Sequence, residues 1–213
     1  TCSPHEEIYS LYGHTAIRWH NMGKQGTAAK GDWVFNWGMF NFNSPHFALR
    51  FVFGLTDYEL GAFPFAYFCP YYKKWGSSVT EQVLNLTNDE KRKIEQALAE
   101  NLKPENKVYR YNYFYDNCST RPRNIIEQCI DGKIEWSERE DYHPTFREMV
   151  RECNRNHDWS RFINDLLLGI KADKKTNREE QEFLPMNLML DFQAAQVYVN
   201  GEYRPLVKEQ RTL

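Results

Sequence analysis

Three residues of this sequence have the types and surroundings that covalent catalysis by a thiol requires, and Cys118 is the first. It follows an aromatic stretch, residues 109–115, in which tyrosine alternates with other residues as in a β-strand. Asp116 and Asn117 are helix-capping types, and Pro122 suits the first turn of a helix. The pattern therefore predicts Cys118 at a helix N-terminus, where unpaired N–H groups and the helix dipole favour a thiolate.

A nucleophilic thiol also needs a base, and His14 is the best candidate among the six histidines. A glycine turn precedes it, and the alternating residues that follow predict a strand with His14, Ala16 and Arg18 on one face. Asn36 lies in the next strand-like segment, residues 32–40, among apolar neighbours, where an amide without a partner is costly. We expect Asn36 to orient the imidazole, as the third residue of a catalytic triad does.

Other interpretations of these residues stay open. Asp32 and Asp116 are alternative orienting residues. A buried histidine is more often structural than catalytic, and a single cysteine usually packs as a small hydrophobic residue. In that case His14 and Cys118 would belong to a non-catalytic binding module.

Three segments resemble a known family. They are Tyr-Gly-His-Thr-Ala-Ile-Arg at 12–18, Phe-Asn-Trp-Gly-Met-Phe-Asn-Phe at 35–42, and Tyr-Phe-Tyr-Asp-Asn-Cys-Ser-Thr-Arg-Pro-Arg at 113–123. They are similar to the N-terminal periplasmic domain of the Lnb-type lipoprotein intramolecular transacylases. The order of histidine before cysteine also resembles the circularly permuted, NlpC-type branch of the papain-like superfamily.

The resemblance implies an α+β fold, in which a strongly curved antiparallel sheet carries His14 and Asn36 and packs on the helix that begins at Cys118. We expect one permuted papain-like domain over residues 1–213. Residues 1–130 would form its catalytic core, and residues 131–213 a helical extension that ends in a hairpin.

The resemblance further implies a cysteine acyltransferase that works through a thioester. An ester-linked acyl chain of a diacylglyceryl lipoprotein would move to the amine of that lipoprotein's N-terminal cysteine. The expected location is the periplasmic side of a bacterial inner-membrane protein whose membrane helices lie outside this sequence. The rival functions are an NlpC-type cell-wall peptidase or amidase, and a non-catalytic lipoprotein- or lipid-binding module.

Several further residues are candidates for substrate binding. Tyr12 and the amides of the helix start could stabilise an oxyanion. Arg18 and Arg121 could meet lipid-headgroup or terminal charges, although Arg18 could equally brace Asp116. Segments 40–53 and 63–72 are rich enough in aromatic residues to cover an acyl chain at a membrane surface. The predicted binding residues are Tyr12, Arg18, Asp116, Asn117, Arg121, Phe42, Phe47 and Phe65.

Composition limits the partners. The formal net charge of −2 does not suggest a nucleic-acid partner. The resemblance instead implies a lipid-modified protein or phospholipid substrate and a membrane surface, and we expect a monomeric domain. The five cysteines lack metal-binding spacing, and we expect no metal and no cofactor. Cys118 and Cys129 would lie about 16 Å apart on one helix, too far for a disulfide, and we expect free thiols.

The remaining sequence predicts a strand over residues 79–86 and a capped helix from Thr87 to Leu102. Helices are expected over residues 145–153, 159–169 and 185–196, with a hairpin turn at Asn200-Gly201. Apolar residues at helical spacing between Trp159 and Ile170 predict a stripe that faces the core. Residues 171–182 are charge-rich and are expected to be an exposed link.

Overall fold

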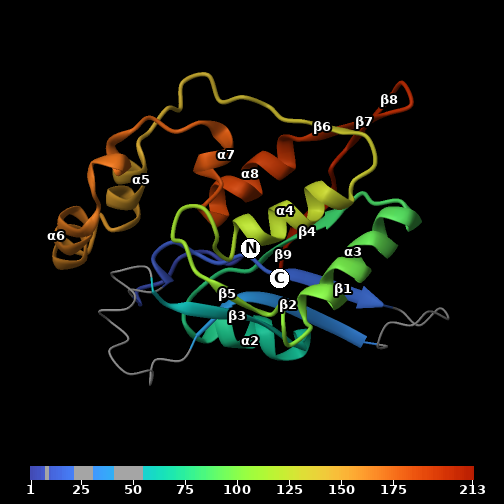
Figure 1. Cartoon of the computed structure of the whole chain (residues 1–213), viewed down its shortest axis with the longest axis horizontal. Coiled ribbons are helices and arrows are strands. Elements are labelled where there is room, and N and C mark those ends of the chain that lie inside the picture. Colours follow the sequence, from blue (N-terminus) through green and yellow to red (C-terminus); the bar gives the residue numbers. More distant parts are fainter. Residues whose placement is uncertain (8–9, 22–30, 41–54) are drawn as a thin grey trace.

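A four-stranded antiparallel sheet forms the centre of an α+β fold (Figure 1). Our structure is a computed structural model that describes residues 1–7, 10–21, 31–40 and 55–213. The sheet has the order β1-β2-β3-β5. Its strands are β1 (Ile17–Asn21), β2 (Gly31–Met39), β3 (Asp57–Pro64) and β5 (Val108–Arg110). The pairing of Asn21 with Gly31 confirms that β1 and β2 form an antiparallel pair, while the connecting residues 22–30 lie outside the described part.

The two faces of this sheet carry different helices. Val34 and Trp37, three residues apart on β2, point to opposite faces because side chains alternate along a strand. Trp37 is fully buried in a core cluster with residues of α3 (Asn88–Asn101) and α4 (Thr120–Cys129). Val34 packs with Phe68 of α2 (Phe65–Lys74), which lies on the other side of the sheet (Figure 1).

Two smaller sheets tie the C-terminal part of the chain to the N-terminal part. β4 (Thr80–Leu84) pairs with β9 (Val207–Thr212). The three-stranded sheet has the order β6-β7-β8, with bounds Lys133–Glu135, Gln196–Val199 and Glu202–Pro205. The predicted hairpin turn is confirmed, because Asn200 and Gly201 both have positive φ, 52° and 88°.

The other helices follow β6 in the chain. They are α5 (Phe146–Cys153), α6 (Asp158–Leu167), the 3₁₀ helix η2 (Ile170–Asp173), α7 (Arg178–Gln181) and α8 (Pro185–Ala194). The predicted capping box at Thr87 is present, and Thr145 starts α5 in the same way. Each of the five cysteines, all within the described residues, has a free thiol, as expected. No helix in the described part of the chain is long and apolar enough to cross a membrane.

Three structural expectations were wrong. The strand before Cys118 ends at Arg110, because Asn112 and Asp116 pair across a turn and bend residues 111–116 away from the sheet. Similarly, His14 pairs with Cys2 in an isolated bridge, and the strand begins only at Ile17.

The third error concerns residues 159–182. The apolar stripe of α6 faces outward rather than toward the core, since Trp159 is 80% exposed and Leu166 74%. The charged link that follows is exposed only in part. Lys171, Asp173, Lys174, Lys175, Asn177 and Glu179 are exposed as expected, whereas Thr176, Gln181 and Glu182 are buried. The buried carboxylate of Glu182 pairs with Arg123 and Arg178, which belong to two different helices.

Candidate functional site

Cys118 lies at the start of α4, held there by its neighbour Asn117. The Oδ1 atom of Asn117 accepts hydrogen bonds from the N–H groups of Ser119 and Thr120, at 2.8 and 3.0 Å. Asn117 therefore caps the turn that leads into α4, whose N-cap residue is Ser119. Its own side-chain N–H groups reach the carbonyl oxygens of Tyr113 and Phe183, both at 2.9 Å. Asn117 thus fixes the backbone beside Cys118 through the helix start and through the carbonyl groups of Tyr113 and Phe183.

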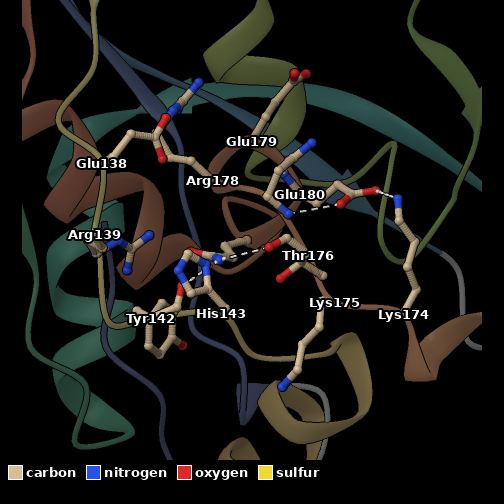
Figure 2. A pocket seen from close by; sticks show the side chains of 12 residues that line it. Glu138, Arg139, Tyr142, His143, Lys174, Lys175, Thr176, Arg178, Glu179 and Glu180 are labelled. Atoms are coloured by element: carbon tan, nitrogen blue, oxygen red, sulfur yellow. Dashed lines mark hydrogen bonds and ion pairs between the residues drawn. The ribbon is translucent and has the colours of Figure 1, made fainter.

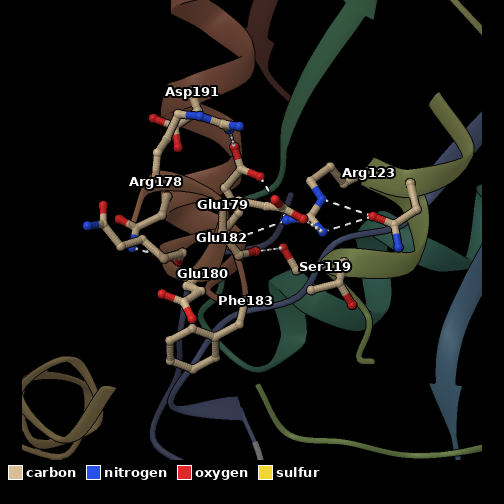
Figure 3. A network of polar contacts seen from close by, with 12 residues as sticks. Ser119, Arg123, Arg178, Glu179, Glu180, Glu182, Phe183 and Asp191 are labelled. Carbon is tan, nitrogen blue, oxygen red and sulfur yellow. Dashed lines mark hydrogen bonds and ion pairs between the residues drawn. The ribbon is translucent and has the colours of Figure 1, made fainter. Parts of the chain in front are cut away.

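A buried polar network clamps the same helix start to α7 and the residues between α7 and α8 (Figure 3). The Ser119 hydroxyl donates to the carbonyl oxygen of Glu182 at 2.7 Å. Arg123 pairs with the Glu182 carboxylate at 3.0 Å and with Glu179 at 3.1 Å. Arg178 pairs with Glu182 as well. Burial raises the pKa of Glu182, and Arg178 and Arg123 oppose that rise. The C-terminal extension therefore helps to position Cys118.

His14 contacts Asn36, the residue predicted to orient it. His14 Nε2 and Asn36 Oδ1 are 2.5 Å apart, and the amide oxygen can only accept, so Nε2 carries the proton. Nδ1 is then the nitrogen that can take a proton. The imidazole also stacks on Tyr72 of α2, with ring centroids 6.0 Å apart and planes 11° from parallel. These contacts fix both the tautomer and the plane of the ring.

Gly38 lies next to both His14 and Cys118. A Cβ atom at Gly38 would lie 3.7 Å from Cys118 Cβ and 3.9 Å from His14 Cε1. The two side chains therefore flank the same point, although residues 14 and 118 are far apart in the sequence. Gly38 has a φ of +119°, and the register of β2 against β3 shifts between Trp37 and Met39. This irregularity of β2 lies directly beside the site.

Burial sets the pKa values of both groups. It raises the pKa of the Cys118 thiol to about 11, although the N–H groups of Thr15 and of Cys118 itself favour the thiolate. Burial also lowers the pKa of His14 to about 4, against the smaller opposing effect of Asn36. Near neutral pH the pair is therefore a neutral thiol beside a neutral imidazole. The expectation of a preformed thiolate at the helix start is wrong, because desolvation outweighs the local N–H groups.

Cys118, His14 and Asn36 line one cavity of about 720 Å³. Tyr12, Gly38 and Asn117 also belong to its wall. Among the described residues that line it, none is Asp, Glu, Lys or Arg. The aromatic residues of the wall, besides Tyr12, are Phe40, Tyr58, Phe63, Tyr67, Phe68, Tyr71, Tyr72, Tyr111, Tyr113 and Phe183. Such a wall favours an apolar ligand, with few polar groups to orient it.

Some predicted binding residues lie elsewhere. Arg18 pairs with Asp32 at 2.5 Å and with Glu81 at 2.5 Å, in a second cavity of about 570 Å³. It therefore does not brace Asp116. Arg18 also covers the ring of Phe65, 3.6 Å from its centroid, so Phe65 lines that second cavity and not the Cys118 cavity. Asp32 contacts Arg18 and His20, whereas His14 bonds to Asn36, so Asp32 is not the residue that orients His14.

The partner of Asp116 is Arg121 of the same segment. Their two hydrogen bonds measure 2.5 and 2.8 Å, and the Arg121 guanidinium lies 3.6 Å from the ring centroid of Tyr109. Neither residue lines the Cys118 cavity, so both brace the turn before the helix. Phe42 and Phe47 lie outside the described residues.

Sequence reasoning did not identify Tyr72, Asn154 and Asn164. The Tyr12 hydroxyl accepts N–H groups from Asn154 of the α5 C-terminus and Asn164 of α6, at 2.6 and 3.2 Å. Tyr72 belongs to a segment that was noted for its aromatic content, but the two asparagines gave no signal in the sequence. They lie more than 140 residues from Tyr12 along the chain.

A third cavity, of about 660 Å³, has a different character (Figure 2). Its wall carries side chains of both charges, among them Arg139, Lys174 and Glu180. Lys174 and Glu180 pair with each other at 3.0 Å. None of the predicted catalytic residues lines it.

Comparison with family models finds one match. Residues 1–152 match the model described as the Lnb N-terminal periplasmic domain. The match includes His14, Asn36 and Cys118, and it ends within α5. No curated protein and no solved structure matches the chain.

Proposed function

This chain belongs to the family of the Lnb N-terminal periplasmic domain, and from that premise we propose that it is a cysteine acyltransferase acting on lipoproteins. Its family makes it a periplasmic domain and connects it with lipoproteins. The observation that carries the proposal is the cavity: it is lined by Cys118 and by the His14–Asn36 pair, and its described wall is aromatic and free of charged side chains.

The first half of the reaction forms a thioester. As the Cys118 sulfur attacks the carbonyl carbon of the donor ester, His14 Nδ1 takes the thiol proton. The N–H groups of Thr15 and Cys118, which point to the sulfur, are placed to stabilise the oxyanion that forms beside it. The imidazolium then gives its proton to the ester oxygen, the C–O bond breaks, and an alcohol leaves.

The second half transfers the acyl group. The amine of the lipoprotein's N-terminal cysteine attacks the thioester carbonyl and loses a proton to His14. The C–S bond breaks, and the proton returns to the Cys118 sulfur. Transfer to an amine rather than to water requires a cavity that excludes water and holds the amine about 3–3.5 Å from the carbonyl. Phe63, Tyr67 and Tyr71 belong to the aromatic wall that supports this requirement.

The same geometry supports the permuted papain-like interpretation of the fold. In chain order the histidine comes first, the orienting asparagine lies on the following strand, and the cysteine begins a helix that packs on the sheet. A cell-wall peptidase could use the same three residues. The described cavity wall, however, lacks the acidic and basic side chains that would bind a charged peptide.

The test is to incubate the protein with a synthetic diacylglyceryl lipopeptide in detergent and to measure intact mass. We expect one acyl adduct on Cys118 that hydroxylamine removes, followed by a lipopeptide with an N-linked acyl chain. Cys129→Ala is the matched control, because Cys129 is buried elsewhere, in the core between α4 and the sheet. Cleavage of a muropeptide without any acyl adduct would support the peptidase instead.

A further inference from the structure

The amphipathic helix α6 exposes its apolar face to solvent, whereas a surface helix usually exposes its polar face. Its apolar residues Trp159, Phe162, Ile163, Leu166 and Leu167 are 48–80% exposed, and Ile170 just beyond it is 87% exposed. These residues recur at helical spacing and so form one continuous stripe, which we name the α6 stripe. A surface helix normally turns such a stripe toward the core.

The polar side of α6 faces the domain instead. The Ser160 hydroxyl donates to Asn154 Oδ1 at 2.6 Å, and Asn164 donates to the Tyr12 hydroxyl at 3.2 Å. Asp165 pairs with Arg151 at 2.9 Å and with Arg147 at 3.4 Å. The hydrogen bonds of Ser160 and Asn164 and the ion pairs of Asp165 therefore hold the helix in this orientation. The exposure of the stripe follows from how α6 is built into the fold.

The α6 stripe lies close to the Cys118 cavity. Ser160 and Asn164, on the inner side of α6, line that cavity. The outer side is one helix diameter away, about 10–12 Å with side chains. A surface that covers the stripe would therefore lie beside the cavity. In Figure 1, α6 forms one end of the molecule, away from α3 and the β7–β8 hairpin.

The segment that surrounds the stripe carries a small excess of positive charge. Residues 147–175 contain seven Lys or Arg against five Asp or Glu, whereas the whole chain has a formal charge of −2. Arg161 lies on α6 itself, where it pairs with Asp158 at 2.8 Å, and Lys171 directly follows Ile170. An apolar stripe flanked by cations has the character of an interfacial helix, which lies in the headgroup region of an anionic bilayer.

A second protein copy suits the stripe less well. A stable protein interface uses about 20–30 residues on each side. The stripe offers six residues, five of them on the ten-residue helix α6. An interfacial helix needs only one apolar face, because that face alone is buried among the lipid acyl chains.

We propose that α6 docks on an anionic phospholipid bilayer through the α6 stripe and thereby holds the opening of the Cys118 cavity at the membrane surface. The docking itself is independent of acyl transfer, and only its purpose rests on the proposed function. A lipid-anchored substrate would then reach Cys118 while part of its acyl chain stays in the bilayer.

The experiment measures vesicle binding of the Cys118→Ala protein, in which no acyl transfer can occur. Vesicles contain phosphatidylglycerol and phosphatidylethanolamine, with pure phosphatidylcholine vesicles for comparison, and bound protein is separated by flotation. We expect binding to the anionic vesicles, weaker binding to phosphatidylcholine, and at least a tenfold loss for Leu166→Glu. Leu190→Glu on α8 is the matched control, since Leu190 is also exposed, at 54%. We expect this variant to bind the anionic vesicles as well as the parent does.

Equal thermal unfolding of both variants will show that the loss is not a folding defect. The proposal is overturned if Leu166→Glu binds like the parent, or if the parent binds no anionic vesicles. It is also overturned if the stripe supports a concentration-dependent dimer that Leu166→Glu abolishes in the absence of vesicle binding. Vesicle binding through α6 without any thioester on Cys118 would keep this inference and refute the proposed function.

Discussion

Cys118 and His14 flank Gly38 as neutral groups, and this determines what each substitution should do. Cys118→Ala should abolish acyl transfer and leave the fold intact, because one thiol at a helix start contributes little packing. His14→Ala should act likewise, and the double variant should be no worse than either single one, since base and nucleophile work as a unit. The measurements are turnover of the lipopeptide and the thermal unfolding midpoint. A folded Cys118→Ala protein that still transfers acyl groups would refute the assignment.

The raised pKa of the Cys118 thiol predicts how it reacts with iodoacetamide. With a pKa of about 11, the thiolate fraction rises roughly tenfold per pH unit through the neutral range. The labelling rate of Cys118 between pH 6 and 9 should therefore increase steeply, as mass spectrometry of the labelled peptide can follow. A rate that is flat over this range would mean that a thiolate is already present at rest, and that the environment of the sulfur is more polar than described here.

The lowered pKa of His14 makes stability depend on pH. His14 has a pKa of about 4 in the folded protein and about 6.5 when unfolded, so the unfolded chain binds the additional proton between these values. Stability from this residue is fully present above about pH 6.5 and falls as the pH decreases toward 4, by roughly 3 kcal/mol in total.

Denaturant unfolding at several pH values can measure this effect. His14→Gln should remove that part of the pH dependence, whereas the exposed His143→Gln should retain it. An unchanged slope in His14→Gln would show that His14 is charged, or accessible to water, in the folded protein.

At the scale of elements, the start of α4 depends on the helices that follow it. Arg123→Ala should cost about 3–5 kcal/mol of unfolding free energy, because it removes one partner of the fully buried Glu182. It should also lower acyl transfer, since the network holds the helix start that carries Cys118. Denaturant unfolding and turnover are the two measurements. Arg92→Ala is the matched control: Arg92 pairs with Asp89 on the surface, where loss of a pair costs at most about 1 kcal/mol.

If Arg123→Ala is no more destabilising than Arg92→Ala, the network does not hold the helix start.

The wrong prediction for the orientation of α6 also has its cause at the scale of elements. The spacing of its apolar residues was correctly recognised as helical, but spacing alone does not state which way a stripe faces. The contacts of Ser160, Asn164 and Asp165 with the domain decide that.

At the scale of the whole molecule, the aromatic cavity should decide which nucleophile receives the acyl group. Tyr67 and Tyr71 line the cavity and are 70% and 52% exposed, so they lie near its opening. Replacing both with serine should admit water and raise the ratio of free fatty acid to N-acylated product, rather than simply slow the reaction.

Mass spectrometry of both products provides the ratio. Tyr203→Ser is the matched control, because Tyr203 is 57% exposed on β8 and does not line the cavity. The same ratio in the double variant and the control would show that these tyrosines do not exclude water. The sequence predicts Phe42, Phe47 and Phe65 for this role. Phe65 lines the second cavity instead, and the other two lie outside the described residues.

The sequence by itself determined the features that depend on local chemistry. The capping types at Thr87 and Asn117 mark helix starts because each side chain bonds to N–H groups two or three residues away. The turn at Asn200-Gly201 is equally local. The motifs around His14, Asn36 and Cys118 also sufficed to indicate the family, which the match over residues 1–152 confirms.

Only the tertiary structure decided the features that depend on what surrounds a residue. Arg18 pairs with Asp32 and Glu81, and Arg121 pairs with Asp116, because the tertiary fold decides which charged side chains lie close together. The protonation states of Cys118 and His14 follow from burial, which no local pattern contains. The direction of the α6 stripe was decided in the same way. An amphipathic helix has two faces, and polar contacts with distant residues such as Tyr12 bind the polar face to the domain and leave the apolar face exposed.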